Sequence, residues 1–88
     1  MPGKEKKTNP GIKEIDIHGL TKAQGKILID NQLKRATSDI YRLRIIHGYR
    51  GGTELRDMVR SVYRKHPKVL RISVGLNQGE TDLVLREL

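Results

Sequence analysis

The stretch "KEIDIHGLTKAQ", residues 13–24, carries the end of a predicted strand and the start of a predicted helix. Its first half, "KEIDIH", alternates apolar with polar residues, which is typical of a strand with one buried face. The "TKAQ" in its second half has the form of a capping box, with Thr21 as the N-cap and Gln24 three residues later. We therefore predict a strand over residues 13–18 and a helix from Thr21 to about Thr37.

The rest of the chain repeats this order of strand and helix. Apolar residues follow the i, i+3, i+4, i+7, i+8 rule from Leu55 to Tyr63 and predict a helix that ends before Pro67. Strands joined through a helix normally run parallel, whereas the short loop between the last two strands implies an antiparallel hairpin. The expected fold class is α/β, a two-layer βαβαββ sandwich with a mixed four-stranded sheet. Its later elements are a strand over 41–48, a helix over 53–65, and strands over 68–75 and 81–88.

The N-terminal segment differs in composition from the rest of the chain. Residues 1–11 combine lysine, proline, glycine and asparagine with almost no apolar content, which predicts a disordered basic tail. The folded domain is expected over residues 12–88, a length that suits one small domain. There is no cysteine, so burial alone must hold the fold. No apolar run is long enough for a membrane span or shaped like a signal peptide, and we expect a cytoplasmic monomer without a membrane partner.

The charge of the chain favours a polyanionic partner. Eighteen Lys and Arg residues against ten Asp and Glu give a net charge of +8, which points to nucleic acid. If both helices cover one face of the sheet, the other face carries Arg42, Arg44 and Arg71, which are either candidate nucleic-acid ligands or ordinary solvated residues. Three tyrosines are the only aromatic residues, so recognition is expected to rely on phosphates more than on stacked bases.

Two histidines, His18 and His47, stand at the ends of two predicted parallel strands, and each is followed by glycine. Ligands gather at the carboxyl ends of parallel strands, and Asp16 lies on the same strand face as His18. Two imidazoles that meet there could divide general base and general acid work. The same three residues could instead form a two-histidine, one-carboxylate site, so a divalent metal ion stays open as a cofactor. Either histidine alone could also be an ordinary turn residue.

A glycine-rich turn, "GYRGGT", follows the second histidine. Gly48, Gly51 and Gly52 could turn successive amides towards an anion, helped by the dipole of the next helix and by Arg50 and Arg56. Phosphate is the natural occupant of such a loop. The histidines and the loop together predict a phosphodiester site, with water or a ribose 2′-hydroxyl as the nucleophile. Alternatively, these residues form an ordinary turn that leads into the helix and binds no anion.

On these residues the chain resembles the small MutS-related (Smr) domain, in its free-standing form. The family's first motif, Leu-Asp-x-His-Gly, is matched by Ile15, Asp16, Ile17, His18 and Gly19. The second, His-Gly-x-Gly-x-Gly and then Leu-Arg, is matched by His47, Gly48, Gly52, Leu55 and Arg56. The third, a glycine turn before a Gly-x-Thr strand, is matched by Gly79 and Thr81. Arg50 stands where the second motif has its middle glycine, and that segment is one residue longer than the commonest form.

The resemblance implies a fold similar to the C-terminal domain of translation initiation factor three, binding to DNA or RNA, and endonuclease activity in several members. It assigns these functions to the first two motifs, which here contain Asp16, His18, Gly19, His47 and Gly48. We therefore expect a nucleic-acid-binding domain with weak or conditional nicking activity, in which His18 and His47 move protons and Asp16 orients His18. The alternative is a module that binds nucleic acid or ribosomes without cutting, and a protein-interaction domain is a third reading.

Overall fold

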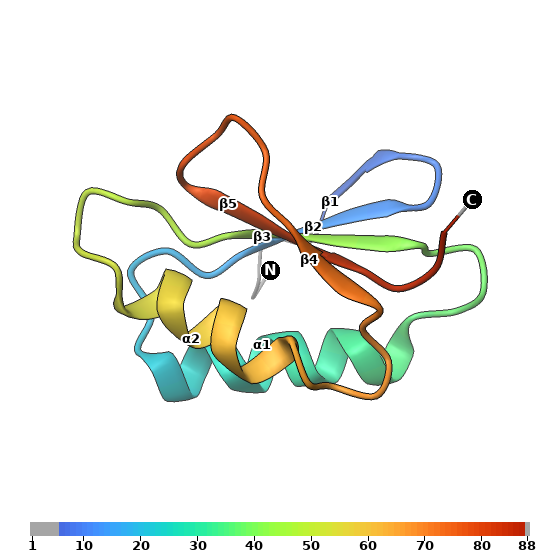
Figure 1. Ribbon diagram of the computed structural model, residues 1–88, viewed down its shortest axis with the longest axis horizontal. Coiled ribbons are helices and arrows are strands. Elements are labelled where there is room, and N and C mark those ends of the chain that lie inside the picture. The colour runs from blue at the N-terminus through green and yellow to red at the C-terminus, as the bar shows by residue number, and fades with distance from the viewer. Residues whose placement is uncertain (1–5, 88) are drawn as a thin grey trace.

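A five-stranded mixed sheet lies over two helices in the computed structural model, which describes residues 6–87 (Figure 1). Each strand and helix that the sequence predicts is present. Both helices begin one residue after and end two residues before their predicted bounds. Within the described residues, neither helix is long and apolar enough to cross a membrane. In chain order the elements are β1 (Lys6–Asn9), β2 (Ile12–Asp16), α1 (Lys22–Arg35), β3 (Arg42–Ile46), α2 (Glu54–Tyr63), β4 (Arg71–Ser73) and β5 (Glu80–Val84).

The strand order across the sheet is β1-β2-β3-β5-β4. β2 and β3 pair in parallel, as expected for strands joined through a helix, and Ile15 lies opposite Ile45. β4 and β5 form the expected antiparallel hairpin, but β5 inserts between β3 and β4 and pairs antiparallel with both. The predicted α/β class, the βαβαββ order and the mixed sheet are thus confirmed.

A fifth strand comes from the segment for which the sequence predicts disorder. Residues 6–9 form β1 and pair antiparallel with β2, and the "KKTN" of this strand lacks the apolar alternation that would have predicted it. The connecting turn needs a glycine, because Gly11 has φ of 89° and a Cβ there would lie 2.5 Å from the Tyr41 ring. The Gly11 carbonyl accepts the Tyr41 amide at 2.9 Å and ties this turn to the start of β3. Residues 1–5 of the predicted tail lie outside the described residues.

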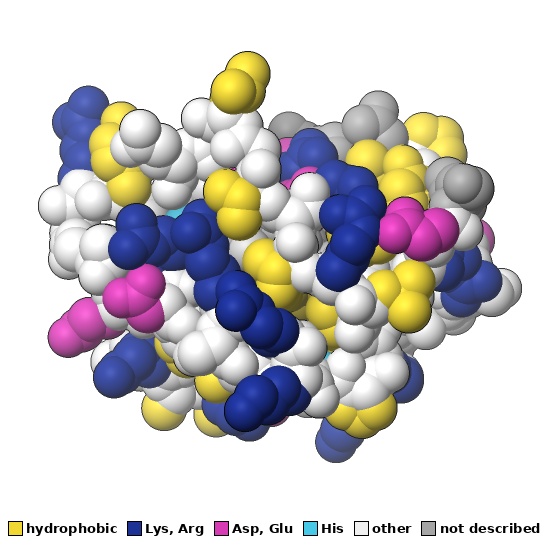
Figure 2. All heavy atoms as spheres, in the orientation of Figure 1, with side chains coloured by type: hydrophobic (Ala, Val, Ile, Leu, Met, Phe, Trp, Pro, Cys, Tyr) yellow, Lys and Arg dark blue, Asp and Glu magenta, His cyan; other side chains and the backbone are white. Residues whose placement is uncertain are grey.

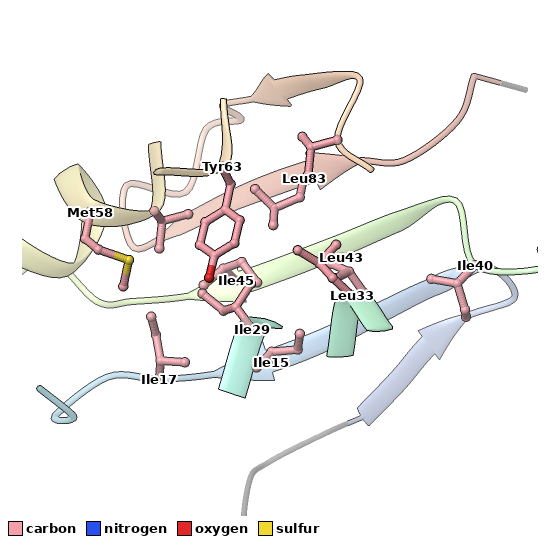
Figure 3. Packing of buried hydrophobic residues seen from close by; sticks show 12 residues of the cluster. Ile15, Ile17, Ile29, Leu33, Ile40, Leu43, Ile45, Met58, Tyr63 and Leu83 are labelled. Atoms are coloured by element: carbon pink, nitrogen blue, oxygen red, sulfur yellow. The ribbon is translucent and has the colours of Figure 1, made fainter. Parts of the chain in front are cut away.

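Both helices cover the same face of the sheet, and the hydrophobic core lies between the two layers (Figures 1 and 3). Alternate residues of β2, β3 and β5 point into this core, because successive side chains of a strand face opposite sides. The opposite face of the sheet therefore carries the intervening residues, among them Arg42 and Arg44 of β3, as the sequence predicts. The central core residues are Ile15, Ile17, Leu43, Ile45 and Leu83 from the strands and Ile29, Leu33, Met58, Val59 and Tyr63 from the helices.

The two helices begin in different ways. α1 starts with the predicted capping box, in which Thr21 Oγ1 accepts the Gln24 amide at 3.1 Å and Gln24 Oε1 accepts the Thr21 amide at 3.0 Å. Gly25 then lets α1 approach the sheet, because a Cβ on it would lie 3.2 Å from Ile17 Cδ1. α2 has Thr53 as its N-cap, but the Thr53 side chain makes no capping hydrogen bond. The first amides of α2 are therefore left without a side-chain cap.

A buried tyrosine joins the two helices to each other. Tyr63 of α2 is fully buried, its hydroxyl donates to Asp30 Oδ1 at 2.6 Å, and it lies 3.2 Å from the carbonyl oxygen of Lys26 on α1. Burial and the hydrogen bond to Asp30 raise the pKa of Tyr63 well above its ordinary value, so the hydroxyl keeps its proton. This contact fixes α2, and with it the loop that leads into α2, against α1.

We expect the substitution Tyr63→Phe to lower the free energy of unfolding by about 1 to 2 kcal/mol, because Asp30 loses a hydrogen-bond donor. Urea unfolding followed by circular dichroism measures this change. Tyr49→Phe is the matched control, since it removes the hydroxyl of an exposed tyrosine, and it should leave the unfolding curve unchanged. Equal unfolding curves for Tyr63→Phe and wild type would show that the hydroxyl does not hold the helices together.

Candidate functional site

The ends of the parallel strands β2 and β3 bring the two histidine segments side by side, as the sequence predicts. The amide of Ile17 donates to the carbonyl of Ile46 at 2.9 Å, so the two segments stay paired beyond the end of β2. A Cβ built on Gly48 would lie 3.5 Å from the Cβ of His18. The first histidine therefore lies directly beside the start of the glycine loop.

His18 forms a pair with Asp16 at this surface. Asp16 Oδ1 accepts the His18 amide at 3.1 Å and lies 2.5 Å from Nδ1 of the imidazole. The carboxylate therefore holds the Nδ1 proton and fixes the orientation of the ring, which leaves Nε2 for another partner. The side chain of His18 is 63% exposed, whereas that of Asp16 is 18% exposed. The geometry suits a surface imidazole that exchanges protons with a bound molecule and is supported from below by a carboxylate.

His47 occupies a different environment, and the expectation that both imidazoles face one substrate is corrected here. His47 is only 4% exposed, and both of its ring nitrogens have partners. Nδ1 lies 2.7 Å from the carbonyl of Gly48, which can only accept, so Nδ1 carries the proton. Nε2 lies 2.8 Å from Thr81 Oγ1 and accepts the hydroxyl proton. His47 thus lies beneath the loop and supports it.

The surroundings of His47 favour its neutral form. Burial is the largest effect and lowers the pKa of His47, while the hydrogen bond to Gly48 acts in the opposite direction. The positive charges of Arg60 and Arg56 lower the pKa of His47 further. A neutral imidazole with both nitrogens engaged is suited to positioning the loop rather than to exchanging a proton with substrate.

The glycine loop turns outward from the sheet just after His47. The carbonyl of Gly79, which precedes β5, accepts the amides of His47 and Gly48 at 2.9 and 3.0 Å. Gly48 and Gly52 have φ of 76° and 109°, a conformation that favours glycine, whereas Gly51 does not. Arg50 lies at the exposed part of this loop and, within residues 6–87, has no ion-pair partner.

A pocket of about 280 Å³ lies between this loop, the start of α2 and the loop that joins β4 to β5. Arg56 and Arg60 of α2 line it, together with Gly48, Gly52 and Thr53. The uncapped N-terminus of α2 adds the positive end of a helix dipole to the same place. Figure 2 shows Lys and Arg side chains gathered over α2. The pocket therefore has the charge and the backbone donors that an anionic group needs.

Sequence reasoning missed Arg60, which serves two parts of the site. Arg60 lines the pocket, and its Nε donates to Thr81 Oγ1 at 3.1 Å, the same hydroxyl that binds His47. Arg56 is paired with Asp57 at 3.2 Å, while Arg60 forms no ion pair among the residues described. The signal was present in the sequence, because Arg56, Arg60 and Arg64 are spaced by four residues and lie along one side of a helix.

The arginines predicted for the open face of the sheet are largely neutralised by acidic partners. Arg42 Nη1 and Arg44 Nε lie 2.8 and 3.0 Å from the carboxylate of Asp82 on β5. The hydrogen bond to Asp82 raises the pKa of Arg44, so the Arg44 guanidinium keeps its charge. Arg71 pairs with Glu87 at 2.8 Å. The structure thus separates these three residues from the pocket and gives them other partners.

The arrangement does not assemble a metal centre. Among residues 6–87, no group of three or more His, Cys, Asp and Glu side chains could hold a metal ion. Asp16 and His18 lie together, but both nitrogens of His47 are engaged by Thr81 and Gly48. The two-histidine, one-carboxylate alternative is therefore not formed by these residues.

We expect the titration midpoint of the His47 imidazole to lie below about pH 6.5, which is the pKa of an unperturbed histidine. Because the folded-state pKa is depressed, the unfolded chain binds more protons below that pH, and the contribution of His47 to stability is lost as the pH falls. An NMR pH titration of the histidine ring protons measures this directly. Titration of His47 at or above pH 6.5 would contradict the buried, neutral assignment.

The comparisons with known proteins agree with this fold. The family model for the Smr domain matches residues 15–82, which contain both histidine segments and the glycine loop. Among solved structures the chain is similar to the crystal structure of the Smr domain of Thermus thermophilus MutS2, with a TM-score of 0.75 and 29% sequence identity, covering 84% of this chain and 98% of that one. No curated protein matches it significantly. Because the family model spans well over half of its length, the chain belongs to the Smr domain family.

Proposed function

We propose that this chain binds nucleic acid at the pocket between the glycine loop and α2, and that it nicks a phosphodiester held there. The observation that carries the proposal is that the Asp16 and His18 pair lies beside Gly48, which itself lines a pocket together with two arginines. Membership of the Smr domain family, which is associated with nucleic-acid binding and nicking, supports the same function. The net charge of +8 supports a polyanionic partner, either DNA or RNA, including RNA in ribosomes.

Binding in this proposal depends on α2 and its loop rather than on the open face of the sheet. Arg60 has no acidic partner in the described part of the chain, and Arg56 shares its charge only with an exposed carboxylate. The amides of the loop and the helix dipole contribute further donors to a phosphate. By contrast, Arg42 and Arg44 share the part-buried carboxylate of Asp82 and would have to leave it before they could bind phosphate.

The proposed chemistry uses one imidazole. His18 Nε2 takes the proton of an attacking hydroxyl, either water or a ribose 2′-hydroxyl, as its oxygen forms a bond to phosphorus. The bond from phosphorus to the leaving oxygen breaks, and that oxygen takes up a proton from solvent. Asp16 stabilises the imidazolium that forms, and Arg56 and Arg60 stabilise the charge that builds on the phosphoryl oxygens. His47 keeps the loop in position through Thr81 and the carbonyl of Gly48.

A module that binds without cutting is the second candidate, and one observation favours it. His47 lies buried beneath the loop, so among the described residues of the two histidine segments only His18 offers an exposed imidazole to substrate. Arg50, where the family motif has glycine, adds a further positive charge to the loop and would strengthen binding rather than catalysis. The two candidates share one binding surface and differ only in whether product forms.

Nicking assays and binding titrations on labelled DNA and RNA separate these functions. We expect His18→Ala to reduce cleavage by about 10² or more while affinity stays near that of wild type, because a general base contributes to rate and not to binding. The double substitution Arg56→Ala, Arg60→Ala should weaken binding to every sequence and flatten its salt dependence. Arg71→Ala is the control on the open face of the sheet and should leave cleavage and affinity near those of wild type, because Arg71 does not line the pocket.

Each result has a clear meaning for the proposal. Cleavage by His18→Ala at the wild-type rate would show that His18 is not the proton carrier. Tight binding with no product from wild type would establish the second candidate. Loss of binding in Arg71→Ala but not in the α2 double variant would place the binding surface on the open face of the sheet.

A further inference from the structure

Apolar side chains are exposed around the pocket, although its lining is cationic. Tyr49 and Val74 are each 55% exposed, and Leu76 is 103% exposed at the tip of the loop between β4 and β5. Tyr49 and Val74 line the same pocket as Arg56 and Arg60. Leu76 follows Gly75, which also lines it. We call Tyr49, Val74 and Leu76 the apolar rim.

The apolar rim is held in place by the backbone beneath it. Asn77 Oδ1 accepts the amide of Gly79 at 2.8 Å, and the carbonyl of Asn77 accepts the amide of Glu80 at 3.3 Å, which closes the loop that carries Leu76. A Cβ on Gly79 would lie 3.4 Å from Cδ1 of the Tyr49 ring, so this ring rests on the start of β5. The rim thus combines an aromatic and two aliphatic side chains from two neighbouring loops.

Exposed apolar side chains gain nothing from the backbone of a regular duplex. In a duplex the phosphates lie outside and the base faces are stacked on one another, so Leu76 and Tyr49 would meet only charged or hydrated groups. An unpaired nucleotide offers a base face within reach of its own phosphate, and base stacking on aromatic and apolar side chains is how single strands are gripped. The apolar rim therefore suits the base of an unpaired nucleotide, and the pocket lined by arginines suits its phosphate.

We propose that the apolar rim holds the base of an unpaired nucleotide whose phosphate lies in the pocket at Arg56 and Arg60. This inference rests on the proposed function and names its substrate class, which is single-stranded or locally unpaired nucleic acid. The base stacks on Tyr49 and packs against Val74 and Leu76. The phosphate then lies beside Gly48, the residue of the pocket that contacts His18. An apolar partner would bury the rim but would leave the charges of Arg56 and Arg60, which line the same pocket as Tyr49 and Val74, without a counterpart.

Fluorescence anisotropy with a short labelled strand, alone and annealed to its complement, tests the inference in both DNA and RNA. We expect wild type to bind the single strand more tightly than the duplex. The double substitution Tyr49→Ala, Leu76→Ala should weaken single-strand binding about tenfold, as expected for the loss of base stacking, and should leave duplex binding nearly unchanged. Tyr49→Phe should retain the wild-type preference because the ring is kept. Ile27→Ala, which truncates an apolar side chain 62% exposed on α1, is the matched control and should have no effect.

The outcomes distinguish this inference from the function on which it rests. Equal affinity for strand and duplex, or an unchanged preference in the rim variant, would overturn the inference, while loss of binding in the Arg56 and Arg60 double variant would still uphold the proposed function. Absence of binding to every nucleic acid at low salt would overturn both. If the rim variant binds nucleic acid as wild type does but loses self-association in sedimentation, the rim is an interface between copies of the chain and the inference is wrong.

Discussion

The carbonyl of Gly79 accepts two hydrogen bonds, from the amides of His47 and Gly48, and the site depends on this one contact. It ties the end of β3 to the start of β5 at the point where the chain leaves the sheet. With both amides fixed, the His47 side chain points under the loop to Thr81, and Gly48 turns the chain outward with φ of 76°. The pocket, the start of α2 and the Tyr49 ring are all placed by this turn.

A short relay of polar groups then fixes the loop from below. Arg60 donates to Thr81, Thr81 donates to His47, and His47 donates to the carbonyl of Gly48. Both ring nitrogens of His47 and the hydroxyl of Thr81 are satisfied, which is what allows a histidine to be buried in so small a core. The relay also connects a residue that lines the pocket with the backbone of the loop beside His18. Arg60 is therefore both a candidate phosphate ligand and part of the support of the loop.

The two histidine segments look alike in sequence, but their imidazoles lie in different environments. The residue two positions before His18 is Asp16, and the residue two positions before His47 is Ile45. The Asp16 carboxylate holds an exposed imidazole in one orientation, whereas His47 follows the alternation of its strand and lies on the buried side, as Ile45 does. The similarity of the segments predicted that they would meet at one edge of the sheet. It did not predict that one imidazole would face outward and the other inward.

The predictions that succeeded rest on local patterns, and those that failed depend on distant partners. The capping box at Thr21 and the periodicity from Leu55 to Tyr63 specify their helices within a few residues, so the order of elements follows from sequence. The insertion of β5 between β3 and β4 brings Asp82 beside Arg42 and Arg44, some 40 positions earlier in the chain. No local pattern encodes that neighbour.

β1 was missed for a related reason. Its pairing is made by backbone groups rather than by an apolar face, so its sequence carries no alternation from which a strand can be predicted. The few aromatic residues likewise predicted recognition through phosphates more than through stacked bases. No local pattern in the sequence shows that the turn at Gly48 brings Tyr49 to the pocket.

An amide NMR titration of the isotope-labelled protein with nucleic acid tests the central claim most directly, because it reports which surface is contacted without any substitution. We expect the largest changes in amide chemical shift at residues 48–56 and 74–79, together with His18. Changes concentrated instead at Arg42, Arg44 and Arg71 on the open face of the sheet, with the loop and α2 unaffected, would contradict it.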